Sequence, residues 1–375
     1  MKKSIFVAIL LLSVTFSNSF AGRTWFYNEI QPPEGYPAIM AGDTAIAMRS
    51  DNTWPVVAYA GATDGAAVML PGAWMPTALN FPGKYLDGAT AQDGTIAFAD
   101  NAGQIVMLGK TGWSSSSYNG SAMYRSSIAF NNNSAPAVLH KSNGSNYLTL
   151  SMKSGSSWYG STIQEYPGGP GVMSDAFALG FDSYNQANAA FRDGSTLRYA
   201  AKGVLTGNQW VLSTLENSPE IGNSGQIDMA LSNNDVPYVI YNDMDFLKYA
   251  IYDRQTDDWT TGVLDSLMGG TPAGNFCVAA DSSGGIGVAY ITQISGQNML
   301  SFAYNNGSGW MLPERLTQAD MNKMVGLTFD YENNPVISYV GMDGKMRIAY
   351  DPFVAPEPAT MAVFALGLAF FRRRK

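Results

Sequence analysis

The sequence predicts an all-β fold in which one unit of four antiparallel strands is repeated along the chain. The clearest unit spans residues 227–264, where four apolar or alternating runs, rich in β-branched and aromatic residues, each end in a cluster of Asn, Asp, Ser or Gly. Such clusters favour tight turns, so the four runs are expected to form one meander. In each unit an aromatic residue, or in one case histidine, lies near the end of the second strand, at Tyr59, Phe98, His140, Phe191, Tyr241, Tyr290 and Tyr339.

A tryptophan opens the fourth strand of six units, after a short polar turn, at Trp74, Trp113, Trp158, Trp210, Trp259 and Trp310. The aromatic residues of successive second strands are 39 to 51 residues apart, a spacing typical of a β-propeller, in which each unit is one blade of a closed ring. A β-sandwich would not repeat at this interval, and a β-helix turn needs far fewer residues. The sequence therefore predicts a propeller of seven blades; because the first two units are shorter, six and eight blades stay open.

The two ends of the repeat predict how the ring closes. The last unit has three strands within residues 324–350 and no tryptophan strand. Residues 23–30, by contrast, form a strand that contains Trp25 and belongs to no unit of its own. We expect this N-terminal strand to pair with the last strand of the final unit and complete that blade. The propeller domain is thus expected over residues 22–353.

Residues 1–21 are typical of a secretory signal peptide. Two lysines precede the apolar run of residues 5–12, and small residues lie where a signal peptidase needs them, with cleavage expected after Ala21. The apolar run is shorter than the roughly 20 residues that cross a bilayer, so a permanent anchor is disfavoured. Cys277 is the only cysteine, so no disulfide can form within the chain, and we expect a small buried apolar side chain there.

The C-terminus carries three features in a fixed order. Pro356, Glu357 and Pro358 precede an apolar run over residues 360–371, and the chain ends in Arg372, Arg373, Arg374 and Lys375. The prolines disfavour regular structure, the apolar run is expected to form a short transmembrane helix, and the basic end holds that helix on the cytoplasmic side. In this order of parts, residues 354–375 resemble the PEP-CTERM sorting signal of Gram-negative bacteria that export polysaccharide.

The resemblance implies a route of export. In that family an exosortase is thought to recognise the tail while it lies in the inner membrane, to cleave near the Pro-Glu-Pro, and to pass the protein to the cell surface or extracellular matrix. Without the N-terminal signal and the basic tail, residues 22–371 hold 16 basic and 30 acidic side chains, a net charge of -14. Such an acidic body disfavours nucleic acid as a partner and permits the binding of cations.

Carboxylates in the loops between second and third strands are the candidate ligand residues. In a propeller these loops share one face with the connections between blades, and here they hold Asp64, Asp100, Asp193, Asp243, Asp245 and Asp343. A ring of carboxylates would suit Ca²⁺ or the hydroxyls of a sugar, whereas the absence of a calcium-loop motif favours solvated turns. No other cofactor is expected. His140 is the only histidine, so we expect it to pack as an aromatic residue rather than to bind a metal.

Catalytic motifs are missing from the sequence. It has no Gly-x-Ser-x-Gly, no cluster of His and Cys, no phosphate-binding loop and no evident pair of convergent carboxylates. Arg125, Glu165 and Arg192 depart from the repeat and are further candidates for a site. The sequence therefore predicts a non-catalytic binding or structural propeller, associated with exopolysaccharide or biofilm, that binds a polysaccharide or a surface protein through one face. A secreted propeller glycosidase or polysaccharide lyase is the alternative.

Overall fold

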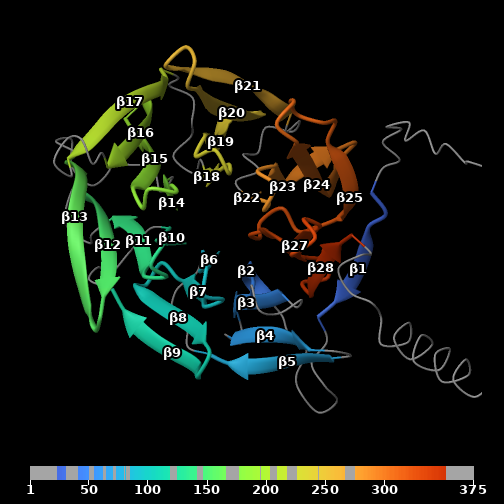
Figure 1. Cartoon of the computed structure of the whole chain (residues 1–375). Helices are drawn as coiled ribbons and strands as arrows, with labels where there is room; N and C mark the ends of the chain where they lie inside the picture. Colours follow the sequence, from blue (N-terminus) through green and yellow to red (C-terminus); the bar gives the residue numbers. More distant parts are fainter. Residues whose placement is uncertain are drawn as a thin grey trace, which may run out of the picture.

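The computed structural model describes residues 23–30, 41–49, 55–61, 65–70, 73–79, 81, 85–118, 125–141, 147–165, 177–194, 196–202, 209–217, 226–243, 245–266 and 275–351. Over these ranges every regular element is a β-strand, and the strands form seven four-stranded antiparallel sheets arranged in a ring (Figure 1). The prediction of an all-β propeller is confirmed. Each four-strand unit recognised in the sequence is one of these sheets.

The first four sheets in chain order take their strands from consecutive segments. The first holds β2 (Ala41–Met48), β3 (Pro55–Gly61), β4 (Gly65–Leu70) and β5 (Ala73–Ala78). The second holds β6 (Asp87–Thr90), β7 (Ile96–Ala99), β8 (Gln104–Gly109) and β9 (Gly112–Ser117). The third holds β10 (Ser127–Phe130), β11 (Pro136–Lys141), β12 (Tyr147–Ser154) and β13 (Ser157–Glu165). The fourth holds β14 (Phe177–Phe181), β15 (Ala187–Asp193), β16 (Thr196–Lys202) and β17 (Trp210–Glu216).

The remaining sheets follow the same order, except for the last. One holds β18 (Ile227–Leu231), β19 (Pro237–Asp243), β20 (Phe246–Asp253) and β21 (Asp258–Ser266). The next holds β22 (Phe276–Ala280), β23 (Ile286–Ile294), β24 (Gln297–Asn305) and β25 (Glu314–Gln318). The last holds β26 (Gly326–Phe329), β27 (Pro335–Val340), β28 (Met346–Tyr350) and, as its outer strand, β1 (Phe26–Glu29). The first strand of each sheet lies nearest the axis and contacts the first strands of its neighbours (Figure 1).

The predicted closure of the ring is confirmed. Strand β1 pairs antiparallel with β28, from Phe26 opposite Tyr350 to Glu29 opposite Arg347, and Figure 1 shows β1 in blue beside β28 in red. Ile30 follows the strand and is buried in the apolar cluster between this sheet and the β2–β5 sheet. The N-terminal strand therefore joins the two ends of the chain both by backbone pairing and through the core.

The repeated tryptophan occupies one register position. Six of the tryptophans pair with the same position of the third strand, as in Trp158 with Lys153, Trp210 with Lys202 and Trp259 with Tyr252. Trp25 lies one residue before the Phe26–Tyr350 pair, which places it at the matching position of the last sheet. Each indole packs against the neighbouring apolar cluster or the aromatic rings beside it, so the repeat marks a structural position.

The innermost turns use side-chain oxygens as backbone acceptors. Oδ1 of Asp182 accepts the N–H groups of Tyr184 and Gln186 at 3.0 and 2.8 Å, and Oδ1 of Asp330 makes the same pair of bonds in the last sheet. Asn185 completes its turn with a φ of 65°, a left-handed conformation that Asn tolerates better than most residues. Asp182 and Asp330 therefore have a structural role in these turns.

His140 is packed in the core as expected. The residue is 0% exposed, its ring lies 5.0 Å from that of Tyr118, and Nε2 lies 2.8 Å from Ser151 Oγ. Burial lowers the pKa of His140 to about 4. The imidazole is therefore neutral near pH 7.

Several predictions concern residues outside the described ranges. These are the signal peptide with its cleavage after Ala21, Asp64, the three residues Pro356, Glu357 and Pro358, the helix over 360–371, and Arg372, Arg373 and Arg374. Among the residues that are described, no helix is long and apolar enough to cross a membrane.

Candidate functional site

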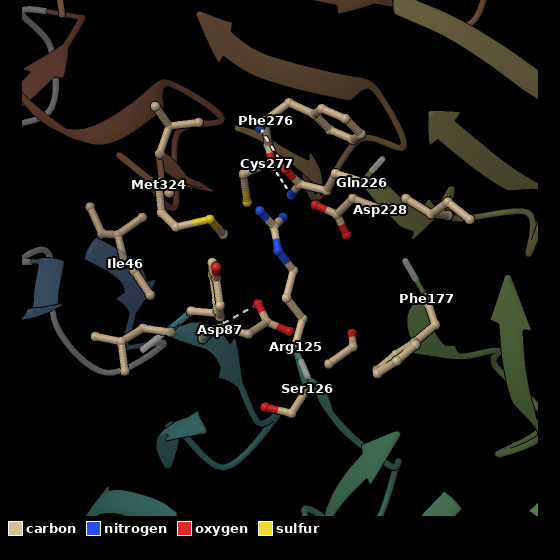
Figure 2. Close-up of a pocket in the computed structure, with 18 residues that line it drawn as sticks. Ile46, Asp87, Arg125, Ser126, Phe177, Gln226, Asp228, Phe276, Cys277 and Met324 are labelled. Carbon is tan, nitrogen blue, oxygen red and sulfur yellow. Dashed lines mark hydrogen bonds between the residues drawn. The ribbon is translucent and has the colours of Figure 1, made fainter. Parts of the chain in front are cut away.

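The axis of the ring forms a pocket lined by the inner strands. One equivalent position on each inner strand holds Ala45, Asp87, Ser127, Ala178, Asp228, Cys277 and Gly326, as judged from the strand registers and the innermost turns. Most of these side chains are small because the inner strands approach closely. A Cβ on Gly326, for example, would lie 2.9 Å from the backbone nitrogen of Ile46 in the next sheet. Asp87 and Asp228 are the exceptions, since they place carboxylates in a space made for small groups (Figure 2).

Both axial carboxylates bind the backbone. Asp87 accepts the N–H of Gly88 at Oδ1 and that of Ile128 at Oδ2, both at 2.8 Å. Asp228 accepts the N–H of its neighbour Met229 at Oδ1 and the N–H of Val278 at Oδ2, at 2.8 and 2.7 Å. Ile128 and Val278 belong to the next sheet in the ring, so each carboxylate links two sheets.

Ser127 shows that this link is a repeated structural device. Its hydroxyl accepts the N–H of Leu179, again from the following sheet, at 3.1 Å. Burial raises the pKa of Asp87 to about 6. Burial, together with the nearby charge of Asp87, raises the pKa of Asp228 to about 7. The two acids thus titrate near neutral pH while serving as clamps between sheets.

Arg125 is the one basic side chain among the described residues that line this pocket. Figure 2 shows it extending through the pocket toward Asp228 and Gln226. Its guanidinium lies 4.9 Å from the ring centroid of Tyr85, and Nη2 is 3.5 Å from Asn275 Oδ1. The pocket has a volume of about 50 Å³, which is enough for a few water molecules but not for a sugar ring.

The predicted acidic residues of the second-to-third-strand loops do not converge. Asp193 pairs with Arg198 at 2.8 Å, Asp243 with Lys248 at 2.9 Å, and Asp343 with Arg347 at 2.7 Å. In each of these pairs the base comes from the third strand of the same sheet. Asp245 is exposed. In the part of the chain that is described, no three His, Cys, Asp or Glu side chains are grouped as metal ligands would be.

Asp100 lies in the core rather than on the surface. It is 0% exposed, and its Oδ1 accepts the N–H groups of Ala102 and Gln104 at 3.0 and 2.9 Å. Because Asp87 pairs with Ala99 as Asp228 pairs with Ile240, Asp100 occupies the position that Tyr241 holds in its own sheet. The carboxylate of Asp100 therefore closes the turn between β7 and β8.

Charges on this face also join neighbouring sheets. The Tyr241 hydroxyl donates to Glu216, which ends the outer strand of the preceding sheet, and Lys248 Nζ lies 2.5 Å from the same carboxylate. One sheet further on, the Tyr290 hydroxyl donates to Asp265 at 2.7 Å and Arg315 binds that carboxylate at 2.6 Å. Two successive interfaces thus repeat one arrangement of tyrosine, acid and base.

Sequence reasoning missed Asp87 and Asp228. A signal was present for Asp228, because it interrupts an apolar inner strand where most other units carry Ala, Ser, Cys or Gly. Asp87 is harder to recognise because the aromatic residue of its unit is Phe98, whereas the register assigns the equivalent position to Asp100. Arg125 was recognised as a departure from the repeat, and it does line the axial pocket.

Comparison with known proteins supports the assignment of the C-terminus. Residues 354–375 match the PEP-CTERM protein-sorting motif. This motif is the signal that an exosortase recognises, and it implies export and sorting to the cell surface. A search of curated proteins found no match to the chain.

Solved structures match the chain at low sequence identity. The SapL1 lectin in complex with alpha methyl fucoside matches with a TM-score of 0.52 and 13% identity over 74% of this chain and 97% of the lectin. YCF48 bound to D1 peptide matches with a TM-score of 0.49 and 14% identity, over 87% and 94% of the two chains. XC5397 from Xanthomonas campestris, a gluconolactonase, matches with a TM-score of 0.47 and 11% identity, over 87% and 100%. The likeness to the lectin shows the fold alone. The protein is thus an exported surface protein with a β-propeller body.

Proposed function

We propose that this protein is a non-catalytic binding propeller of the cell surface or extracellular matrix, with an exported polysaccharide as its ligand. The sorting motif at residues 354–375 places it among exported proteins, and the fold is one that a fucoside-binding lectin also uses. During export the apolar run at residues 360–371 holds the chain in the inner membrane until an exosortase cleaves it.

The observation that carries the non-catalytic assignment is the state of the axial carboxylates. All four oxygens of Asp87 and Asp228 accept backbone N–H groups, and two of these bonds hold neighbouring sheets together. Glycoside hydrolysis needs one carboxyl that gives a proton to the leaving oxygen and another that faces the sugar or a water. Carboxylates committed to the backbone are poorly suited to either task.

A propeller glycosidase or lyase is the alternative, and one observation favours it. The pKa values of Asp87 and Asp228, about 6 and about 7, lie in the range that general acids use near neutral pH. Against this reading, the pocket between these residues has only about 50 Å³ of space. The alternative therefore requires the axis to open before a sugar could reach the acids.

One experiment separates the two functions. The mature protein is incubated with the exopolysaccharide of its own host, and both co-sedimentation and the release of reducing ends are measured. We expect binding without release. Release that disappears in Asp228→Asn would replace the binding function with the enzymatic one, and the absence of both binding and release would leave a protein partner or a structural role.

A further inference from the structure

A groove separates the β14–β17 sheet from the β18–β21 sheet, away from the axis. It has a volume of about 480 Å³, within the range of sites for small ligands and nearly ten times that of the axial pocket. Its walls come from the outer strands of one sheet and from the turns and outer strands of the next. The groove is therefore large enough for a sugar unit without any movement of the sheets.

Three aromatic rings meet in this groove. The Trp259 indole is partly exposed and lies 5.0 Å from the Tyr199 ring in an edge-to-face arrangement and 5.4 Å from the Tyr252 ring. Trp259 Nε1 donates to Ser213 Oγ at 3.3 Å, which ties the indole to the opposite wall. Tyr199 donates to Asn188 Oδ1 at 2.5 Å, and Tyr252 donates to Asp257. These bonds hold the rings in place before any ligand arrives, which lowers the entropic cost of binding.

The groove is acidic and rich in hydrogen-bond acceptors. It is lined by four aspartates and one arginine, namely Asp182, Asp235, Asp257, Asp258 and Arg254. Asp235 uses both oxygens to bind Ser183 of the preceding sheet, at 2.7 and 2.5 Å. Asp182, Asp257 and Asp258 each use one oxygen for a turn, a tyrosine or a backbone N–H, and the other oxygen has no donor among the described residues. A ligand here meets free acceptors and an excess of negative charge.

The turn that supplies Arg254 and Asp257 is longer than the matching turns of several other sheets, although the β16–β17 connection is longer still. Four residues lie between Asp253 and Asp258, the last pair of the β20–β21 hairpin. Only two lie between the last paired residues of the β8–β9 and β12–β13 hairpins. The longer turn carries both charged side chains into the groove, so these charges belong to this sheet and not to the repeat.

From this combination we infer that the groove binds a sugar unit that carries an ammonium group, which names both the site and the ligand class of the function proposed above. The hydroxyl and ammonium groups of an amino sugar are donors for the free carboxylate oxygens. Its positive charge matches the acidic walls and is attracted to the aromatic faces, of which tryptophan provides the strongest cation–π partner. A neutral sugar has no ionic attraction to the acidic groove, and an acidic sugar is repelled by it.

The test compares three ligands that differ at one position of the ring. The mature protein is titrated by calorimetry with the methyl glycosides of glucosamine, N-acetylglucosamine and glucose. The glucosamine glycoside should bind about tenfold more tightly than the two neutral ones, with an affinity that falls as salt is added. Equal affinity for all three would overturn the charge argument, and no binding by any of them would overturn the site.

Variants locate the site. Asp257→Asn should weaken binding of the glucosamine glycoside about two- to fivefold, as expected for one partly screened charge. Trp259→Leu keeps an apolar side chain but removes the aromatic face, and should weaken binding about tenfold. The matched control is Asp245→Asn, which makes the same charge change in an exposed residue at the opposite end of β20 and should leave the affinity unchanged.

The two variants also keep this inference separate from the function proposed above. Because Asp257 is exposed, its substitution tests the groove even where Trp259→Leu does not fold. Full affinity for the glycoside in both folded variants would overturn the groove as the site. If the protein binds the glucosamine glycoside in the groove but binds no polysaccharide, the site stands and the proposed function is wrong. If polysaccharide binding survives both substitutions, the proposed function stands and the groove is not the site.

Discussion

Replacing Ile30 with alanine tests whether the N-terminal strand closes the ring. The side chain of Ile30 is 2% exposed and lies in the apolar cluster between the β26–β28 strands with β1 and the β2–β5 sheet. Its backbone N–H donates to the carbonyl of Met346 at 2.9 Å, so the residue is fixed between segments from opposite ends of the chain. Truncating a buried isoleucine to alanine costs about 2–5 kcal/mol.

The expected change in melting temperature follows from the size of the domain. A body of about 330 residues unfolds with an entropy of about 0.7 kcal/mol per degree, so Ile30→Ala should lower Tm by about 3–7 °C. Thermal unfolding followed by circular dichroism measures this shift. Val263→Ala is the matched control, because Val263 lies on an outer strand, is 56% exposed, and should change Tm by less than about 1 °C. A Tm for Ile30→Ala as little changed as that of the control would refute the closure of the ring through the core.

Three further predictions concern titratable groups. The pKa of His140 is about 4 in the folded protein, against about 6.5 in the unfolded chain. The contribution of His140 to the free energy of unfolding is therefore highest above pH 6.5 and falls by about 3 kcal/mol as the pH is lowered to 4. Chemical denaturation at both pH values should show a smaller loss in His140→Phe. The pKa of Asp228 is raised, so its protonation removes a destabilising charge, and this effect increases the free energy of unfolding as the pH falls from 8 toward 4. Asp228→Asn should not show this increase. An identical pH profile for the variant would contradict the raised pKa of Asp228. A chelator should leave Tm unchanged because Asp193, Asp243 and Asp343 are already paired with bases, and a drop of several degrees on adding EDTA would show that calcium binds after all.

The repeat explains how much of the fold was readable from the sequence. One register position is held by Trp158, Trp210 and Trp259, because every sheet packs a large ring beneath its outer strand. A packing position that is repeated in every sheet gives a residue that is repeated along the sequence. The same need made the closing strand recognisable through Trp25, although it lies more than 300 residues from its partner β28. Position within a repeating unit was thus enough to predict pairing at long range.

The axial and groove residues were not readable in the same way. Asp87 and Asp228 are 141 residues apart, and only the curvature of the ring brings both to the axis. Trp259 recurs at one register position and is structural, yet the groove also exposes part of its ring. A repeated residue acquires a second role where its neighbours vary, and here the variation is the longer turn that holds Arg254 and Asp257.

The closing sheet brings the first and last strands of the propeller together. Phe26 starts β1 opposite Tyr350, the last residue of β28, so both ends of the propeller leave from the same end of one sheet. The sorting motif begins at residue 354, a few residues beyond β28. A cut at either end therefore falls outside the paired strands and leaves the contacts of Ile30 in place. Because β1 is tied to β28 by backbone pairing along its whole length, a force applied at the C-terminal end of β28 would load the strand pair that holds the ring shut.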